Sequence, residues 1–220
     1  MNEVFVSTAP RASVICPEAP ESVTQAQMCK ALRDDERPGV VLGEVSRRVL
    51  KWLPLPHPPA VWFPVFQVRM KGVCNSVSMF LVVAVLRILC RGVWTAARFH
   101  AHPRGCLFGC REGRDDISHY QHCPRVSGFF SSWAPLLFPL GLAAPLPVLC
   151  CVDGRAPDSK RDIALCTLAE CLVHSHSQYR LHLVSASTPP ESVCEGRLRM
   201  LMLRHPPIRA AIHHARNPLG

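Results

Sequence analysis

The 220-residue sequence lacks the short motifs that mark several large classes of enzyme. It has no Gly-x-Ser-x-Gly nucleophile elbow, no phosphate-binding Walker loop, no Gly-rich dinucleotide fingerprint and no His-Glu-x-x-His zinc helix. A Cys–His nucleophile pair stays open, because such partners need not lie close together in sequence. The length allows one modest domain, or two small ones with tails, and is too short for a complete polymerase or kinase.

The chain also has little lysine, and its N-terminus has no secretory character. Only four of the 25 basic residues are Lys, and no Asn-x-Ser/Thr glycosylation site occurs. Residues 1–16 contain Glu3, no basic start and no long apolar core, so they do not resemble a signal peptide. We therefore expect an intracellular protein, in the nucleus or cytoplasm, whose 12 cysteines are reduced.

Basic residues outnumber acidic residues by 25 to 16, so the formal net charge is +9. This surplus favours a polyanionic partner, such as nucleic acid or an anionic membrane surface. A basic surface without any specific partner is the alternative interpretation. Hydrophobic residues make up 48% of the chain and charged residues 19%, which argues against wholesale disorder.

Proline clusters and apolar periodicity predict a mainly α-helical, irregular fold. Residues 1–66 are expected to form a weakly ordered leader with a short amphipathic helix over 41–52 and a Pro-rich linker over 53–66. Residues 67–125 are expected to hold a helix over 76–99, capped by Asn75 or Ser76, and then a small zinc knuckle.

The region 126–157 is apolar and rich in proline. No charged residue lies between Val126 and Val152, and a run of this length could span a bilayer. Four prolines, at 135, 139, 145 and 147, argue against one continuous spanning helix and favour buried, irregular packing. A membrane-associated protein that uses residues 129–152 is the alternative.

The last region, 158–220, is expected to be helical. Asp158 or Ser159 can cap a helix that runs to about Val184. Thr188, followed by Pro189, can start a second helix that ends at about Arg204, before two further prolines. Residues 208–215 are expected to add one or two further turns.

The clearest chemical signal is a set of metal-ligating side chains over residues 106–124. Their spacing is Cys106-x3-Cys110-x8-His119-x3-Cys123, with His122 as a rival to His119. Three thiolates and one imidazole make a closed tetrahedral site for a single structural Zn²⁺. A Cys-x2-Cys opening would be the commoner pattern, and chance clustering in a chain rich in Cys and His is the alternative.

The same segment resembles a known family. The motifs are Cys-x-Phe-Gly-Cys, starting at Cys106, and Asp-Asp-Ile-x-His-Tyr-x-x-Cys-Pro, starting at Asp115. They are similar to the zinc-binding segment that follows the polymerase domain in non-LTR retrotransposon reverse transcriptases. The resemblance covers about residues 83–125, because residues 85–90 and 94–100 also look like the stretch that leads into that segment.

The resemblance implies that Cys106, Cys110, His119 and Cys123 are metal ligands and that the segment contacts template nucleic acid. The aromatic-x-Asp-Asp turn of the polymerase core is missing, so we expect a non-catalytic fragment and not an enzyme. A decayed reading frame without selected activity is a further alternative. Seven arginines between residues 87 and 125 could contact phosphates without sequence preference: Arg87, Arg91, Arg98, Arg104, Arg111, Arg114 and Arg125.

Overall fold

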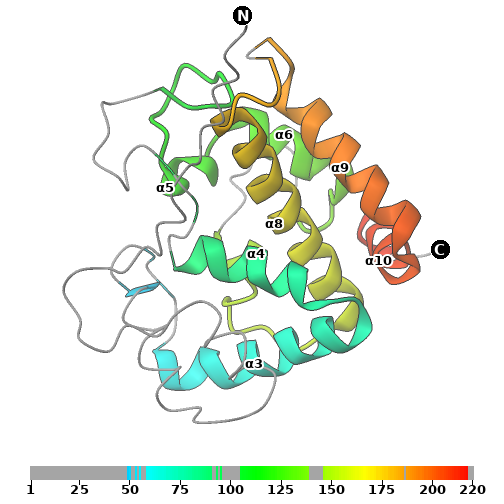
Figure 1. The fold of residues 1–220 in the computed structure, drawn as a ribbon. Coiled ribbons are helices and arrows are strands. Elements are labelled where there is room, and N and C mark those ends of the chain that lie inside the picture. The colour runs from blue at the N-terminus through cyan, green and yellow to red at the C-terminus, as the bar shows by residue number, and fades with distance from the viewer. Residues whose placement is uncertain are drawn as a thin grey trace, which may run out of the picture.

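The computed structural model describes residues 49–50, 53, 55, 58–90, 93, 95, 105–138, 146–185 and 187–217. Within these ranges the chain forms eight helices with defined bounds and no strand, which confirms the prediction of a mainly α-helical fold (Figure 1). The predicted N-terminal leader lies outside the described residues, as does the helix predicted over 41–52 except for residues 49 and 50.

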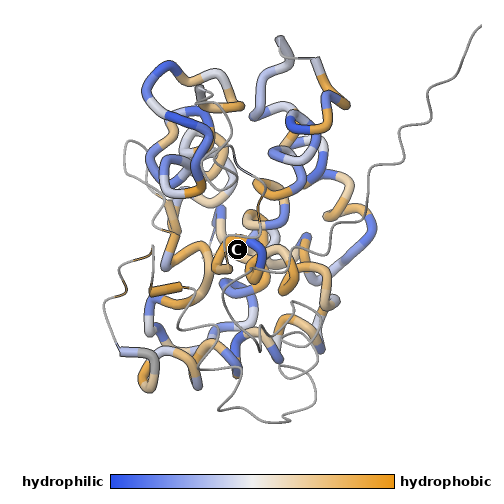
Figure 2. The backbone as a smooth tube through the Cα atoms, turned by 60° about the vertical axis from the view of Figure 1, so that its left-hand side comes forward, coloured by the Kyte–Doolittle hydropathy of each residue, from blue (hydrophilic) through white to orange (hydrophobic). Residues whose placement is uncertain are grey.

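The first two helices form an antiparallel hairpin at one end of the molecule (Figure 1). Helix α3 spans Pro59–Ser76 and helix α4 spans Met79–Leu89. Helix α4 is strongly apolar, with Arg87 as its one charged residue, whereas α3 also carries Arg69 and Lys71; Figure 2 accordingly shows a mixture of hydrophobic and hydrophilic residues at this end. The face of α3 that turns inward buries five large side chains: Trp62, Phe63, Phe66, Met70 and Val73.

The predicted linker over 53–66 is wrong for residues 59–66, because these residues are the start of α3. Proline is compatible with the first turn of a helix, where its missing N–H would have no partner inside the helix. Pro64 lies inside α3 and removes one backbone hydrogen bond, at a cost of about 3 kcal/mol. Burial of each aromatic side chain of α3 contributes about 1.5–3 kcal/mol, so together they outweigh this cost.

The helix predicted over 76–99 is shorter than expected at both ends. Because α3 continues to Ser76, α4 starts after Ser78, and neither predicted cap is used. At the other end α4 stops at Leu89, and the backbone N–H of Val93 donates to the carbonyl of Arg87 at 3.3 Å. This return bond satisfies a carbonyl at the end of the helix. Of the residues from 91 to 99, the structure describes only Val93 and Thr95.

Helix α8, Ser159–Arg180, runs through the middle of the molecule and packs against α3, α4, α9 and α10 (Figure 1). Asp158 caps it, as predicted, and accepts a hydrogen bond from the backbone N–H of Arg161 at 3.0 Å. The helix ends at Arg180, four residues before the predicted Val184, and His182 follows with a positive φ of 54°. Leu183 therefore lies outside the apolar stripe and is 63% exposed.

Two C-terminal helices pack beside α8 and α6. Helix α9 spans Pro190–Arg204 and ends where the sequence predicts, but its N-cap is Pro189 and not Thr188. Helix α10 spans Pro206–Arg216 and is longer than the predicted one or two turns. Its buried face consists of Ile208, Ala211, Ile212 and Ala215.

The described parts of the apolar region 126–157 are folded into the body of the molecule. It contributes α6, Pro124–Trp133, and the short α7, Leu146–Leu149, with Phe129, Phe130 and Phe138 buried. The predicted boundary at 125/126 therefore cuts through α6. Among the residues that the structure describes, no helix combines the length and the apolar character needed to cross a bilayer.

A buried arginine connects the α3–α4 hairpin to the start of α8. The Arg69 guanidinium is fully buried and donates to Asp162 at 2.7 and 2.9 Å. It also donates to Asp153 at 2.7 Å and to the backbone carbonyl of Cys151 at 3.0 Å. Burial alone would lower the pKa of Arg69, but the Cys151 side chain and the carboxylates of Asp162 and Asp153 more than offset burial and raise it.

Candidate metal centre

The first half of the site is a tight turn between Cys106 and Cys110. The backbone N–H of Cys106 donates to the carbonyl of Gly113 at 2.9 Å, next to an isolated antiparallel bridge between Gly105 and Arg114. The turn closes through the N–H of Gly109, which donates to the carbonyl of Cys106 at 3.0 Å. Gly109 has a φ of +70°, a conformation that glycine adopts without strain. The backbone thus brings both thiols to the same side of the turn.

The second half of the site comes from two helix ends. The short α5, Ile117–Tyr120, is capped by Asp116, which accepts from the backbone N–H of Ser118 at 3.1 Å and holds His119 in the first turns. Cys123 is the N-cap residue of α6. The His119 ring lies against Gly113, where a Cβ atom would be only 2.1 Å from Nδ1 of the imidazole. Glycine at 113 therefore leaves the space that the ring occupies.

The four predicted ligands form one compact cluster. All four donor atoms lie within 4.8 Å of one another. The Sγ atoms of Cys106 and Cys123 are 3.7 Å apart, and Sγ of Cys110 is 3.0 Å from Nε2 of His119. Two thiolates on a tetrahedral zinc, each at about 2.3 Å, would lie about 3.8 Å apart. The donor set and the Cys106–Cys123 spacing therefore fit one metal ion, and the other donors lie close enough to reach it after small side-chain movements.

The structure also distinguishes between the two histidines that the sequence offers as ligands. His119 is half-buried and belongs to the cluster, whereas His122 is exposed and lies outside it. The three cysteines are at most 7% exposed, and no other group of metal-ligating residues occurs in the described ranges. The protein therefore shields the three sulfur atoms from solvent and partly shields the imidazole of His119.

The cluster favours a thiolate at Cys123. The hydrogen bond between the sulfurs of Cys106 and Cys123 lowers the pKa of Cys123 to about 5 against the opposing effect of burial, with help from the backbone N–H groups of Val126 and Arg125. These two N–H groups belong to the first turn of α6, where the helix dipole also favours negative charge. The same hydrogen bond, together with burial, raises the pKa of Cys106.

A buried polar network, which sequence reasoning missed, fixes the knuckle (residues 105–123) to α8. Asp115 is fully buried and accepts hydrogen bonds from the Tyr120 hydroxyl and from Nε2 of His176, the latter at 3.1 Å. Burial is the largest cause that raises the pKa of the Tyr120 hydroxyl, and the neighbouring Asp115 carboxylate raises it further. The Asp115–His176 contact joins residues 61 apart in sequence, so no local pattern could have signalled it.

An aromatic cluster strengthens the same junction. Phe108, on the turn between the first two cysteines, is 2% exposed. Its ring centroid lies 5.0 Å from that of Tyr120 and 5.7 Å from that of Tyr179 on α8. The knuckle therefore shares its core with α8 and is not an independent appendage.

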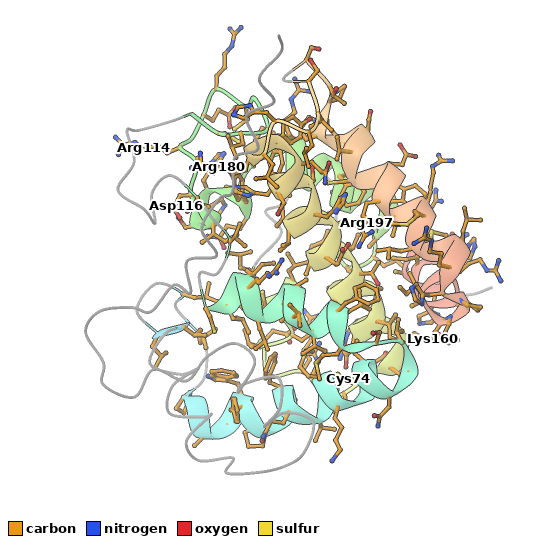
Figure 3. The ribbon with its side chains drawn as sticks, in the orientation of Figure 1. Cys74, Arg114, Asp116, Lys160, Arg180 and Arg197 are labelled. Atoms are coloured by element: carbon orange, nitrogen blue, oxygen red, sulfur yellow. The ribbon has the colours of Figure 1, made fainter. Side chains whose placement is uncertain are left out.

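The structure describes four of the seven arginines that were predicted to contact nucleic acid. Arg87, Arg111, Arg114 and Arg125 are all exposed, and Figure 3 shows the side chain of Arg114 pointing away from the body of the molecule. Arg125 also forms a surface ion pair with Glu191 at 3.7 Å. The other three, Arg91, Arg98 and Arg104, lie outside the described residues.

Comparison of the chain with models of protein families, with curated proteins and with solved structures gives no match.

Proposed function

We propose that the chain binds one structural Zn²⁺ through Cys106, Cys110, His119 and Cys123, and that it is a non-catalytic, nucleic-acid-binding protein. The observation that carries the zinc assignment is the convergence of three sulfurs and one imidazole nitrogen within 4.8 Å. Four protein donors leave no open position for water, which favours a structural role over a catalytic one. Zinc would supply the cross-link that holds this short, loop-rich segment together.

Two features support nucleic acid as the partner. The chain carries a net charge of +9, and Arg111 and Arg114 of the knuckle, with Arg125 two residues after it, are exposed. The resemblance to reverse-transcriptase C-terminal segments points to the same partner. In this proposal the knuckle presents these arginines to phosphates, and contacts of this kind carry no sequence preference.

An intracellular location, in the nucleus or cytoplasm, belongs to the same proposal. The ten cysteines within the described ranges are all free thiols. Free thiols persist in the reducing compartments of the cell, where they are also available as zinc ligands.

Metal content tests the zinc assignment directly. Native mass spectrometry of the wild type is expected to give one zinc per chain, and the Cys106→Ser/Cys123→Ser variant is expected to give none. Cys74→Ser/Cys90→Ser is the matched control, because it removes two half-buried thiols outside the cluster and is expected to keep the metal. A wild type without zinc, or a cluster variant that retains it, would refute the assignment.

Salt-dependent binding tests the partner. Arg111→Gln/Arg114→Gln is expected to weaken binding equally for duplexes of different sequence. It should also flatten the slope of log K against log salt by up to about 0.9 per arginine. The charge-conserving Arg111→Lys/Arg114→Lys variant is the control and should retain the slope. Wild-type protein that does not bind nucleic acid even at about 50 mM salt would refute the partner.

A further inference from the structure

The two C-terminal helices carry five arginines against two glutamates, Glu191 and Glu195, which both lie near the start of α9. From residue 196 to residue 217 the chain contains five arginines, three histidines and no Asp or Glu. The arginines are Arg197, Arg199, Arg204, Arg209 and Arg216. Because α9 and α10 pack against each other, these charges gather in one part of the molecule (Figure 1).

Four of these five arginines are exposed and available to bind a partner. Arg197 is not, because it points toward α8 and makes a bidentate ion pair with Glu170, with both Nε–oxygen distances at 3.0 Å (Figure 3). The other four are exposed. Arg199 has only a surface pair with Glu195 at 2.6 Å, a type of contact worth about 0–1 kcal/mol. A phosphate can compete with a pair of this strength.

Trp133 of α6 holds two of the cations in place. The guanidinium carbon of Arg216 lies 4.9 Å from the centroid of the indole ring, and that of Arg199 lies 5.9 Å from it. Contacts of this kind at partly exposed sites contribute about 0.5–1 kcal/mol each. The same ring therefore orders one arginine from α9 and one from α10, which reduces the entropy that a bound ligand would otherwise have to remove.

The knuckle has no comparable surplus of charge. Over the knuckle and the two residues that follow it (105–125), Arg111, Arg114 and Arg125 are balanced by Glu112, Asp115 and Asp116. One zinc ion with three thiolates and a neutral imidazole would add a further net negative charge. Over residues 190–217 five arginines against Glu191 and Glu195 give a net charge of +3, so the electrostatic attraction for a polyanion is stronger at α9–α10 than at the knuckle.

The packing of α10 favours nucleic acid over a lipid surface as the partner. A helix that binds a membrane needs a free apolar face to insert among the lipids. In α10 this face, from Ile208 to Ala215, is buried and packs chiefly on α8. Only the cationic side of the helix remains available to a partner.

We propose that the exposed arginines of α9 and α10 (Arg199, Arg204, Arg209 and Arg216) form a phosphate-binding surface, and that it is the principal contact with the nucleic-acid backbone. This inference rests on the proposed partner but not on the proposed contact site at the knuckle. It also does not require the resemblance, which covers only about residues 83–125.

The test compares salt slopes for variants on the two surfaces. Arg204→Gln/Arg209→Gln removes two exposed cations that have no ion pair among the described residues, and glutamine preserves helix propensity. Binding to a short labelled DNA duplex, and to one of its strands, is measured from about 50 to 200 mM salt. The slope is expected to fall by about 0.9 per arginine on the duplex and about 0.7 on the single strand.

Two companion variants make each outcome decisive. Arg204→Lys/Arg209→Lys replaces the same two residues but keeps their charge, so it is expected to keep the slope. This control distinguishes the loss of phosphate contacts from misfolding caused by substitution at these positions. Arg111→Gln/Arg114→Gln is expected to change the slope less than the α9–α10 variant does. A larger change for the knuckle variant would overturn this inference and leave the proposed function standing.

An unchanged slope in Arg204→Gln/Arg209→Gln would also overturn the inference. If the wild type binds neither form of nucleic acid, the inference and the proposed partner both fail, while the zinc content measured on the same sample remains a separate result. Binding to anionic phosphatidylserine vesicles in place of nucleic acid would identify the surface as a lipid-binding one and would likewise overturn the inference.

Discussion

At the scale of single residues, Gly113 has a direct steric connection to the metal site. No side chain fits at this position, because a Cβ atom would lie 2.1 Å from Nδ1 and 2.3 Å from Cε1 of His119. The imidazole would have to move from its present position to relieve this clash. Gly105, which belongs to the same turn, has nothing within 4 Å of a Cβ atom and can accept alanine.

We therefore expect Gly113→Ala to weaken zinc binding about 10- to 100-fold, the loss found when support of a ligand is removed. The measurement is a competition titration against a chromogenic chelator. Gly105→Ala is the matched control and should bind zinc as the wild type does. Equal zinc affinities for the two variants would show that His119 is not a ligand.

Single residues of the metal site also show which of its features the sequence predicts and which it does not. The spacing of Cys106, Cys110, His119 and Cys123 predicts the whole cluster, because turn geometry and helix periodicity place these side chains locally. The choice between His119 and His122 needed the structure, since both lie on or beside the same short helix. The contact of Asp115 could not be predicted from the sequence either, because its partner His176 lies on a helix that is distant along the chain.

At the scale of elements, the sequence predicts helices well where apolar periodicity and a cap agree. Helix α8 begins at the predicted cap, and α9 ends where two prolines follow. The prediction fails for α3, because proline clusters were interpreted as a linker, whereas buried aromatic side chains hold residues 59–66 in a helix. Proline restricts the local backbone, but tertiary packing decides whether a helix can tolerate it.

The junction of α3 with α8 depends on Arg69. Its guanidinium is fully buried and is the partner of Asp162, which is itself only 2% exposed. Arg69→Ala would leave this buried carboxylate with only the more distant and weaker ion pair to Arg161, at 3.6 Å. We expect the free energy of unfolding to fall by about 3–5 kcal/mol, as found when one member of a buried ion pair is removed.

Urea unfolding followed by circular dichroism measures this loss. Arg155→Ala is the control, because Arg155 pairs with Asp153, the other carboxylate partner of Arg69, but is 56% exposed. That variant should change the free energy of unfolding by no more than about 1 kcal/mol. A similarly small change in Arg69→Ala would show that the junction does not depend on this ion pair.

At the scale of the whole molecule, the knuckle and the helical body should unfold as one unit. Phe108 and Tyr120 of the knuckle pack on Tyr179 and His176 of α8, and all four are at most 7% exposed. One ligand, Cys123, is also the N-cap of α6, which packs on α9. Opening the knuckle would therefore expose apolar surface that belongs to the body.

We expect zinc to stabilise the entire fold in a single cooperative transition. At free zinc about 100-fold above the dissociation constant, linkage adds about 2.7 kcal/mol to the free energy of unfolding. Thermal unfolding followed by far-ultraviolet and near-ultraviolet circular dichroism should give coincident transitions that shift upward together with zinc. The Cys106→Ser/Cys123→Ser variant should show no shift. Two separate transitions, of which only the minor one responds to zinc, would mean that α8 does not need the knuckle and that Phe108 contributes little to the common core.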